Sequence, residues 1–312
     1  MSIEPLDGLW VALRAASWVL LFQAAGAQLF LALFGRELGG SWMRIRRLGL
    51  RSGLAALVCV LAQLGLEPAR LAGELSGFLD PAMWRTALGA GTASASTTRL
   101  SGLLLLCLAL RAARAAPAAA ATMRMPEDGA VRVDGVAPVQ VLGVLASALA
   151  LFSFVLTGHT AVSPRRWLLC PLLLAHLCIL AFWCGALPGL RIVSLCESGL
   201  RLVGVMRAFS RLAVWLVPLI LVAGGGLALG LVPSLAVLRQ PYGEILLGKV
   251  AAFALLMALA AWNQLRLTAA IESGAARAVS ALRLSVSLEQ LLIAMVLVAT
   301  AIMTGLFSPE AG

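Results

Sequence analysis

Residues 167–189 read WLLCPLLLAHLCILAFWCGALPG, and this run contains no aspartate, glutamate, lysine or arginine. A helix needs about 20 mostly apolar residues to cross the hydrocarbon core of a bilayer, so the run is long enough for one membrane span. Seven more apolar runs of comparable length occur in the chain, at residues 9–34, 48–66, 99–116, 139–159, 208–232, 245–268 and 286–307. The sequence therefore predicts an all-α, polytopic transmembrane helical bundle of about eight spans.

The composition of the whole chain excludes a soluble domain. Of its 312 residues 61% are hydrophobic and 12% are charged, and the mean hydropathy is +0.98. Soluble domains carry about 25% charged residues. The net charge of +10 comes almost wholly from arginine, because Lys249 is the only lysine. These arginines cluster between the apolar runs, which indicates membrane topology and argues against nucleic-acid binding.

The loops alternate in charge along the chain. Residues 1–8 are acidic, whereas arginines are concentrated in the loop after the first span and in the stretches 111–138, 190–207 and 269–283. Arginine-rich loops tend to stay in the cytoplasm, so we expect these four loops on the inner side. An even number of spans then places both termini on the outer side.

Three parts follow from this organisation. Residues 1–116 form an N-terminal four-span half in which three spans are clear, and its remaining segment, 72–93, is a loop with a short interfacial or re-entrant helix. Residues 117–138 are rich in alanine, proline and turn formers, which predicts a cytoplasmic linker. Residues 139–312 form a second half with five spans.

The only two histidines lie on one predicted helical hairpin. His159 ends the fourth span and His176 lies inside the fifth, with Pro164 breaking the helix between them. Counted from this turn, His159 lies near the outer surface and His176 about 15 Å below that surface. The difference in depth of about 10 Å disfavours one metal ion shared by both histidines. It favours two steps of a pathway or two separate sites.

Cysteines surround the two histidines. Cys170 lies about as deep as His159 across the hairpin, and Cys178 and Cys184 lie further down the fifth span. Imidazole and sulfur together suit copper, and soft sulfur favours Cu(I) over Cu(II). His159, His176 and Cys170 are therefore the candidate metal ligands. The alternatives are histidines that join two helices by hydrogen bonds and cysteines that fill the core, since the cysteine spacing matches no closed metal site.

Two charged residues within the last two spans also need an explanation. Lys249 lies near the outer end of the seventh span. It either snorkels at the interface beside Glu244 or lines an outer cavity that receives the substrate. Glu289 lies near the inner end of the eighth span, where we expect it to pair with Arg283 or Arg266.

A series of short motifs runs through the second half of the chain. They are Gly158-His159, Ala175-His176, Phe182-Trp183-Cys184-Gly185-Ala186-Leu187, Arg207-Ala208-Phe209-Ser210, Tyr242-Gly243-Glu244 with Lys249, Asn263, and Leu282-Arg283 with Leu288-Glu289. In their order and their positions on helices, residues 155–308 resemble the copper resistance protein D (CopD) family of bacterial inner-membrane proteins. The N-terminal half resembles this family mainly in its hydropathy.

The resemblance implies copper handling at the bacterial inner membrane, with uptake into the cytoplasm alongside a periplasmic copper carrier protein. It makes His159 and His176 the candidate copper residues. Trp183, Tyr242, Lys249 and Asn263 match the family pattern as well. The chain departs from the family in its cysteines near His176 and in lacking methionine-rich outer loops.

These observations favour a copper-binding membrane transporter or copper-homeostasis protein that is not an enzyme. No P-loop, HExxH or GxSxG motif occurs in the chain, which argues against an ATP-driven pump. One alternative is a membrane redox protein with haem between the two histidines, although their unequal depths argue against it. The other is a non-transporting membrane partner that delivers copper to another protein.

Overall fold

The computed structural model describes residues 5–89, 91–113, 138–197, 199–231, 241–275 and 277–306. Within these ranges, six side chains lie outside the description, those of His159, Leu231, Pro241, Tyr242, Glu272 and Leu306. The predicted linker at 117–138 falls almost entirely outside the described residues.

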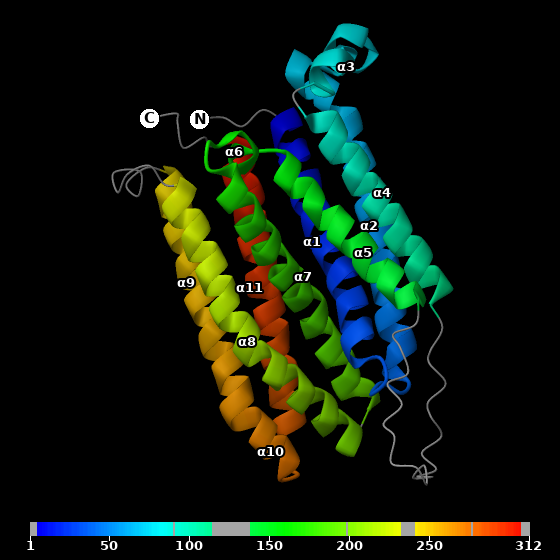
Figure 1. Cartoon of the computed structure of the whole chain (residues 1–312), viewed down its shortest axis with the longest axis vertical. Coiled ribbons are helices and arrows are strands. Elements are labelled where there is room, and N and C mark those ends of the chain that lie inside the picture. Colours follow the sequence, from blue (N-terminus) through cyan, green and yellow to red (C-terminus); the bar gives the residue numbers. More distant parts are fainter. Residues whose placement is uncertain are drawn as a thin grey trace.

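The described residues form helices that are joined by turns (Figure 1). The elements are α1 Pro5–Phe34, α2 Ser41–Ala72, η1 Leu75–Leu79, α3 Pro81–Ala87, α4 Thr92–Ala112, α5 Pro138–Phe152, η2 Ser153–Leu156, α6 His159–Val162, α7 Arg166–Cys196, α8 Leu200–Leu231, α9 Pro241–Trp262, η4 Asn263–Leu267, α10 Thr268–Glu272 and α11 Ala278–Leu306. Among the described residues, eight helical segments are long and apolar enough to cross a membrane. The predicted all-α bundle of eight spans is thereby confirmed.

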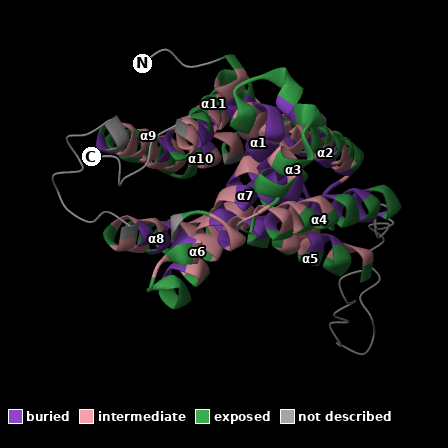
Figure 2. Cartoon of the chain, turned by 90° about the horizontal axis from the view of Figure 1, so that it is seen from above, coloured by how far each residue is buried: buried purple, intermediate pink, exposed green. Residues whose placement is uncertain are grey.

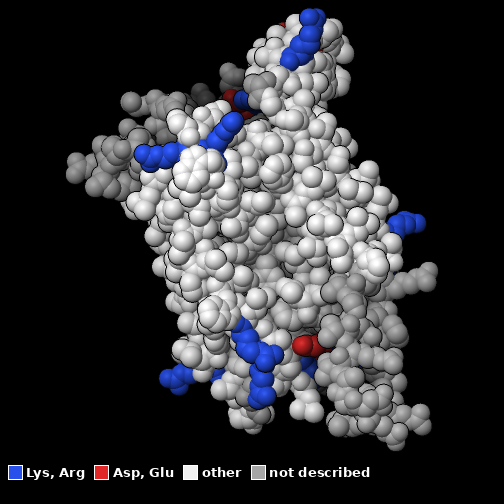
Figure 3. Space-filling view, viewed as in Figure 1, with Lys and Arg blue, Asp and Glu red and all other residues white. Residues whose placement is uncertain are grey.

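Several helices extend past the apolar runs that predicted them. For example, α2 has 32 residues, or about 48 Å at 1.5 Å per residue, whereas the hydrocarbon core is about 30 Å thick. Backbone hydrogen bonding continues into the polar ends, which hydropathy does not detect. Charged side chains are concentrated at the two ends of the bundle (Figure 3), and α1 begins at the same end where α11 finishes (Figure 1).

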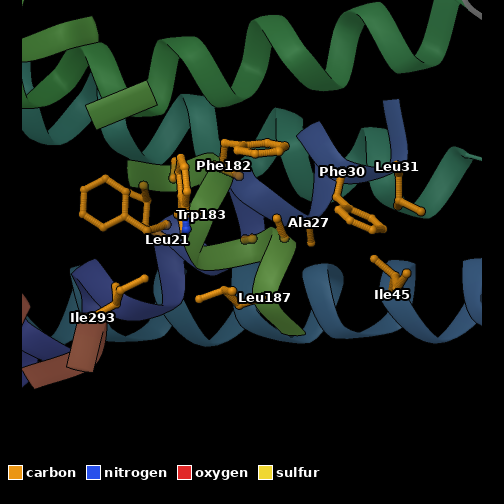
Figure 4. Packing of buried hydrophobic residues seen from close by; sticks show 14 of the residues in the cluster. Leu21, Ala27, Phe30, Leu31, Ile45, Phe182, Trp183, Leu187 and Ile293 are labelled. Atoms are coloured by element: carbon orange, nitrogen blue, oxygen red, sulfur yellow. The ribbon is translucent and has the colours of Figure 1, made fainter. Parts of the chain in front are cut away.

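The centre of the bundle is the contact between α1 and α7. α1 is the most buried of the eight spans, and Figure 2 shows α8 and α9 at the periphery. Leu21 and Phe30 of α1 are fully buried, and Leu187 of α7 is 2% exposed. Figure 4 shows these three side chains within the hydrophobic core. Lipid tails are as apolar as leucine, so helices in a bilayer are held together by close packing. Small residues at this crossing allow the close approach: Gly26 and Ala27 on α1, and Ala181 and Gly185 on α7.

The segment predicted as an interfacial or re-entrant helix consists of the 3₁₀ turn η1 and the short helix α3. Both lie at one end of the bundle, beyond α2 and α4 (Figure 1). Asp80 caps α3 by accepting a hydrogen bond from the backbone N–H of Ala82 at 2.7 Å. The Trp84 indole donates to the carbonyl of Phe78 at 2.8 Å, which closes η1 and α3 into one compact unit.

At the other end of the bundle, hydrogen bonds to Glu197 connect the α7–α8 turn to the α1–α2 loop. Glu197 accepts hydrogen bonds from the N–H of Gly39 at 2.9 Å, from the N–H of Ser41 at 3.0 Å and from the Ser41 hydroxyl at 2.8 Å. Arg201 lies 3.9 Å from its other carboxylate oxygen. Burial alone would raise the pKa of Glu197, but these hydrogen bonds and the arginine outweigh burial and lower it.

This contact predicts an acid-sensitive stability that depends on Glu197. Because the folded pKa is below the unfolded value of about 4.3, the contribution is full above that pH and is lost as the pH falls through the folded pKa. Hydrogen bonds to a charged group contribute about 1.5–3 kcal/mol, so Glu197→Ala should lose about 2 kcal/mol at pH 7. Thermal unfolding in detergent between pH 3 and pH 7 measures this. Glu37→Ala, at an exposed glutamate in the same region, is the control, and an equal loss in both variants would contradict the assignment.

Candidate functional site

The hairpin predicted to carry the metal ligands begins with a tight turn. Gly158 has a φ of +80°, a conformation that residues with a side chain rarely adopt. This turn starts α6 at His159, whose side chain lies outside the described atoms. The next residue, Thr160, is buried, and its carbonyl oxygen lies 3.7 Å from Sγ of Cys170 on α7. Cys170 thus lies beside the turn that carries His159.

His176 lies six residues further along α7, about 9 Å below Cys170. It faces α8 at Gly224, where an added Cβ would lie 3.2 Å from Cε1 and 3.3 Å from Nδ1 of the imidazole. The absence of a side chain at Gly224 makes room for the ring between the two helices. His176 is thus held between α7 and α8, separated along the hairpin from the turn at His159.

One ring nitrogen of His176 is left without a partner. Nδ1 is buried with no hydrogen-bond partner among the described residues, and the backbone of Ile220 on α8 lies near the ring. In the tautomer that carries its proton on Nε2, Nδ1 keeps its lone pair. Metal-binding histidines coordinate through such a lone pair.

Lys249 approaches this region from α9. Its side chain is partly buried, and its charge acts on His176. Glu244 is exposed, and no ion pair within the described part of the chain joins it to Lys249. The cavity-lining role of Lys249 stays a prediction. The side chain of Tyr242, at the start of the same helix, lies outside the description.

The remaining family-pattern residue on α7 belongs to the packed core. Trp183 is 6% exposed and packs edge-on against Phe182 and Phe209, with ring centroids 6.1 Å and 6.2 Å apart. The six cysteines are all free. Within the described ranges, no group of three or more histidine, cysteine, aspartate or glutamate side chains is placed to hold a metal ion. The two candidate ligands described on α7, Cys170 and His176, therefore lie apart along the helix.

A buried polar pair occupies the helices beyond His176. Asn263 begins the π-helical turn η4, and its Nδ2 donates to Oε1 of Glu289, which is 2% exposed. The predicted pairing of Glu289 with Arg283 or Arg266 is wrong. Arg283 instead donates from Nε to the hydroxyl of Ser194 at 3.1 Å, and no described ion pair involves Glu289. Hydropathy could not show this because a π turn rotates the residues that follow it to a different face.

A pocket of about 570 Å³ opens far from the histidines. Arg201, Gly204 and Arg211 line it from the first turns of α8, together with Arg36 and Glu37 after α1. Gly224, which faces His176, lies about 20 Å further along α8. The pocket is therefore not part of the hairpin site.

Three arginines of the N-terminal half stand out in the structure although hydropathy did not reveal them. Arg14, Arg70 and Arg99 lie within helices counted as membrane spans, and all three have their guanidinium over aromatic rings. One signal was present in the sequence. Trp10 and Trp18 stand four residues before and after Arg14, a spacing that places all three on one helix face.

The fold and these buried polar residues define a multi-pass helical membrane protein. Residues 203–303, about a third of the chain, match the family described as copper resistance protein D, and the resemblance to that family is thereby confirmed over this segment. It runs from α8 to α11 and includes Lys249, Asn263 and Glu289, whereas His159, Cys170 and His176 precede it. No curated protein and no solved structure matches the chain significantly.

Proposed function

We propose that this protein binds copper and carries it across the membrane in copper homeostasis, and that it is not an enzyme. The family match supports a role in copper resistance. The observation that carries the proposal is His176, an imidazole held inside the bundle with an unpartnered Nδ1. Copper is the transported ion in this proposal, and the sulfur of Cys170 favours Cu(I).

The proposed path begins at the turn between α6 and α7. Copper reaches the protein from the outer side near His159 and Cys170, and then passes to His176 between α7 and α8. Ligands spaced about 9 Å apart along α7 suit transport, because an ion has to leave each site as readily as it binds there. By resemblance to the family, the membrane is the bacterial inner membrane, the direction is uptake, and a periplasmic copper carrier protein supplies the ion.

Copper uptake into sealed proteoliposomes tests this proposal. We expect Cu(I) to accumulate above the level of protein-free liposomes, and His176→Ala to bring accumulation down to that level. Binding of copper without accumulation would favour a non-transporting partner that delivers copper. A haem Soret band in the purified protein, lost in His176→Ala, would favour the redox alternative.

A further inference from the structure

Three arginines lie close together at one end of the N-terminal half. Arg14 is on α1, Arg70 is near the end of α2, and Arg99 is in the second turn of α4. Arg14 lies over the Trp18 ring and Arg99 over the Phe154 ring, and the centres of these two rings are 5.4 Å apart. The charge of Arg14 acts on Arg99, and the charges of Glu67 and Arg70 act on Arg14. The cluster lies where these helices approach the end of the bundle that carries α3 (Figure 1).

The positive charge of Arg70 is balanced by two carboxylates. One guanidinium nitrogen lies 2.7 Å from a carboxylate oxygen of Glu67 and another lies 3.4 Å from Asp7. Its guanidinium carbon is also 4.7 Å from the centre of the Trp10 ring. The two carboxylates of the cluster are therefore both engaged by this one arginine.

Arg14 and Arg99 are held by aromatic rings and no carboxylate. The guanidinium carbon of Arg14 lies 4.8 Å from the centre of the Trp10 ring and 4.9 Å from that of Trp18. Arg99 lies 4.3 Å from the centre of the Phe154 ring, and its Nε donates to the Ser153 hydroxyl at 3.0 Å. Within the described part of the chain, neither arginine has an ion pair.

Among the described residues, the cluster carries an uncompensated positive charge. Three described guanidinium groups face two described carboxylates, which leaves one net positive charge within apolar spans. Aromatic faces orient a cation but do not neutralise it, and charged side chains inside membrane spans are normally paired. One further negative charge would complete the cluster.

We propose that Arg14 and Arg99 together bind the phosphate group of an anionic phospholipid. A phosphodiester has a single negative charge, which is the charge that the cluster lacks. Guanidinium groups form paired hydrogen bonds with phosphate oxygens, and basic sites between membrane helices bind lipid headgroups. Arg14 and Arg99 lie about 10–14 Å from the first residues of their helices, so both lie in the half of their span that is nearer the end of the bundle carrying α3.

The test is a set of thermal unfolding measurements on the purified full chain. The protein is unfolded in neutral detergent alone, with phosphatidylglycerol, with phosphatidylcholine and with inorganic phosphate. The variants are Arg14→Gln, Arg99→Gln and, as a matched control, Arg111→Gln, which changes an exposed arginine on the same helix as Arg99. Two variants of the site are used so that a failure of one to fold does not end the test.

We expect phosphatidylglycerol to raise the melting temperature of the wild type by about 5 °C and phosphatidylcholine to leave it unchanged. In detergent alone, each site variant should have a higher melting temperature than the wild type, because the substitution removes an unpaired charge. With phosphatidylglycerol, each site variant should have a lower melting temperature than the wild type. Arg111→Gln should behave as the wild type.

Three results would overturn the proposal. Site variants that melt lower than the wild type in both conditions would make the arginines purely structural. Site variants that melt higher in both would mean that no lipid is bound. An equal rise with inorganic phosphate alone would assign the site to a soluble anion. None of these readouts involves copper, so they stand apart from the test of transport.

Discussion

Gly185→Val should abolish the native packing of the bundle, with a loss of about 3 kcal/mol or more. An added Cβ at Gly185 would lie 1.9 Å from the carbonyl carbon of Gly26 and 2.1 Å from the nitrogen of Ala27. The atoms in the way belong to the backbone of α1, so no rotation of a side chain can relieve the clash. α1 and α7 would have to separate, and the buried core lies on both sides of their contact.

The same reasoning applies to the partner glycine. An added Cβ at Gly26 would lie 1.8 Å from the carbonyl oxygen of Ala181, so Gly26→Val should match Gly185→Val. Size-exclusion profiles and melting temperatures in detergent measure both variants. Gly225→Val on α8 is the matched control, because an added Cβ there meets nothing within 4 Å. Native-like profiles for the two crossing variants would show that α1 and α7 do not pack as described.

The number and class of the spans could be predicted because each apolar run is long enough to cross a bilayer by itself. The run at 167–189 illustrates this, since it falls within α7, Arg166–Cys196. The ends of α7 could not be predicted, because its backbone hydrogen bonds extend past the apolar run into residues that hydropathy reads as loop. Which helices cross at Gly26 and Gly185 was also beyond prediction, since contacts between distant segments leave no local pattern.

The candidate site was predictable only in part. The two histidines could be found because ionisable residues are rare and costly in membrane spans, and the helical rise gave their separation along the hairpin. The pairing of Glu289 with Asn263 was missed because a contact between residues on separate helices leaves no local pattern in the sequence. Arg14 and Arg99 were missed because one arginine changes the mean hydropathy of a span very little.

His176→Ala should lower the affinity of the purified protein for Cu(I) by at least about tenfold. Loss of a residue that only supports a metal ligand lowers metal affinity by about 10–100-fold, so loss of a ligand should lower it at least as much. Nδ1 of His176 has no hydrogen-bond partner among the described residues, and alanine offers no lone pair in its place. Copper retained after gel filtration under reducing conditions measures the effect. Cys178→Ala is the control, because a residue two positions along a helix points to a different face. Retention that is equal in His176→Ala and the wild type would remove His176 from the path.

Lys249→Gln should have the opposite effect on copper retention. The charge of Lys249 acts on His176, so it opposes a copper ion bound to the imidazole, and its removal should slow the release of that ion. A transport site has to release its ion to function, so we expect Lys249→Gln to retain more copper than the wild type while transporting it more slowly. If Lys249→Gln instead retained less copper, the lysine would be supporting the bound state. Opposite changes in the two variants would place His176 and Lys249 in one site, where the imidazole binds the ion and the ammonium group keeps that binding weak enough for transport.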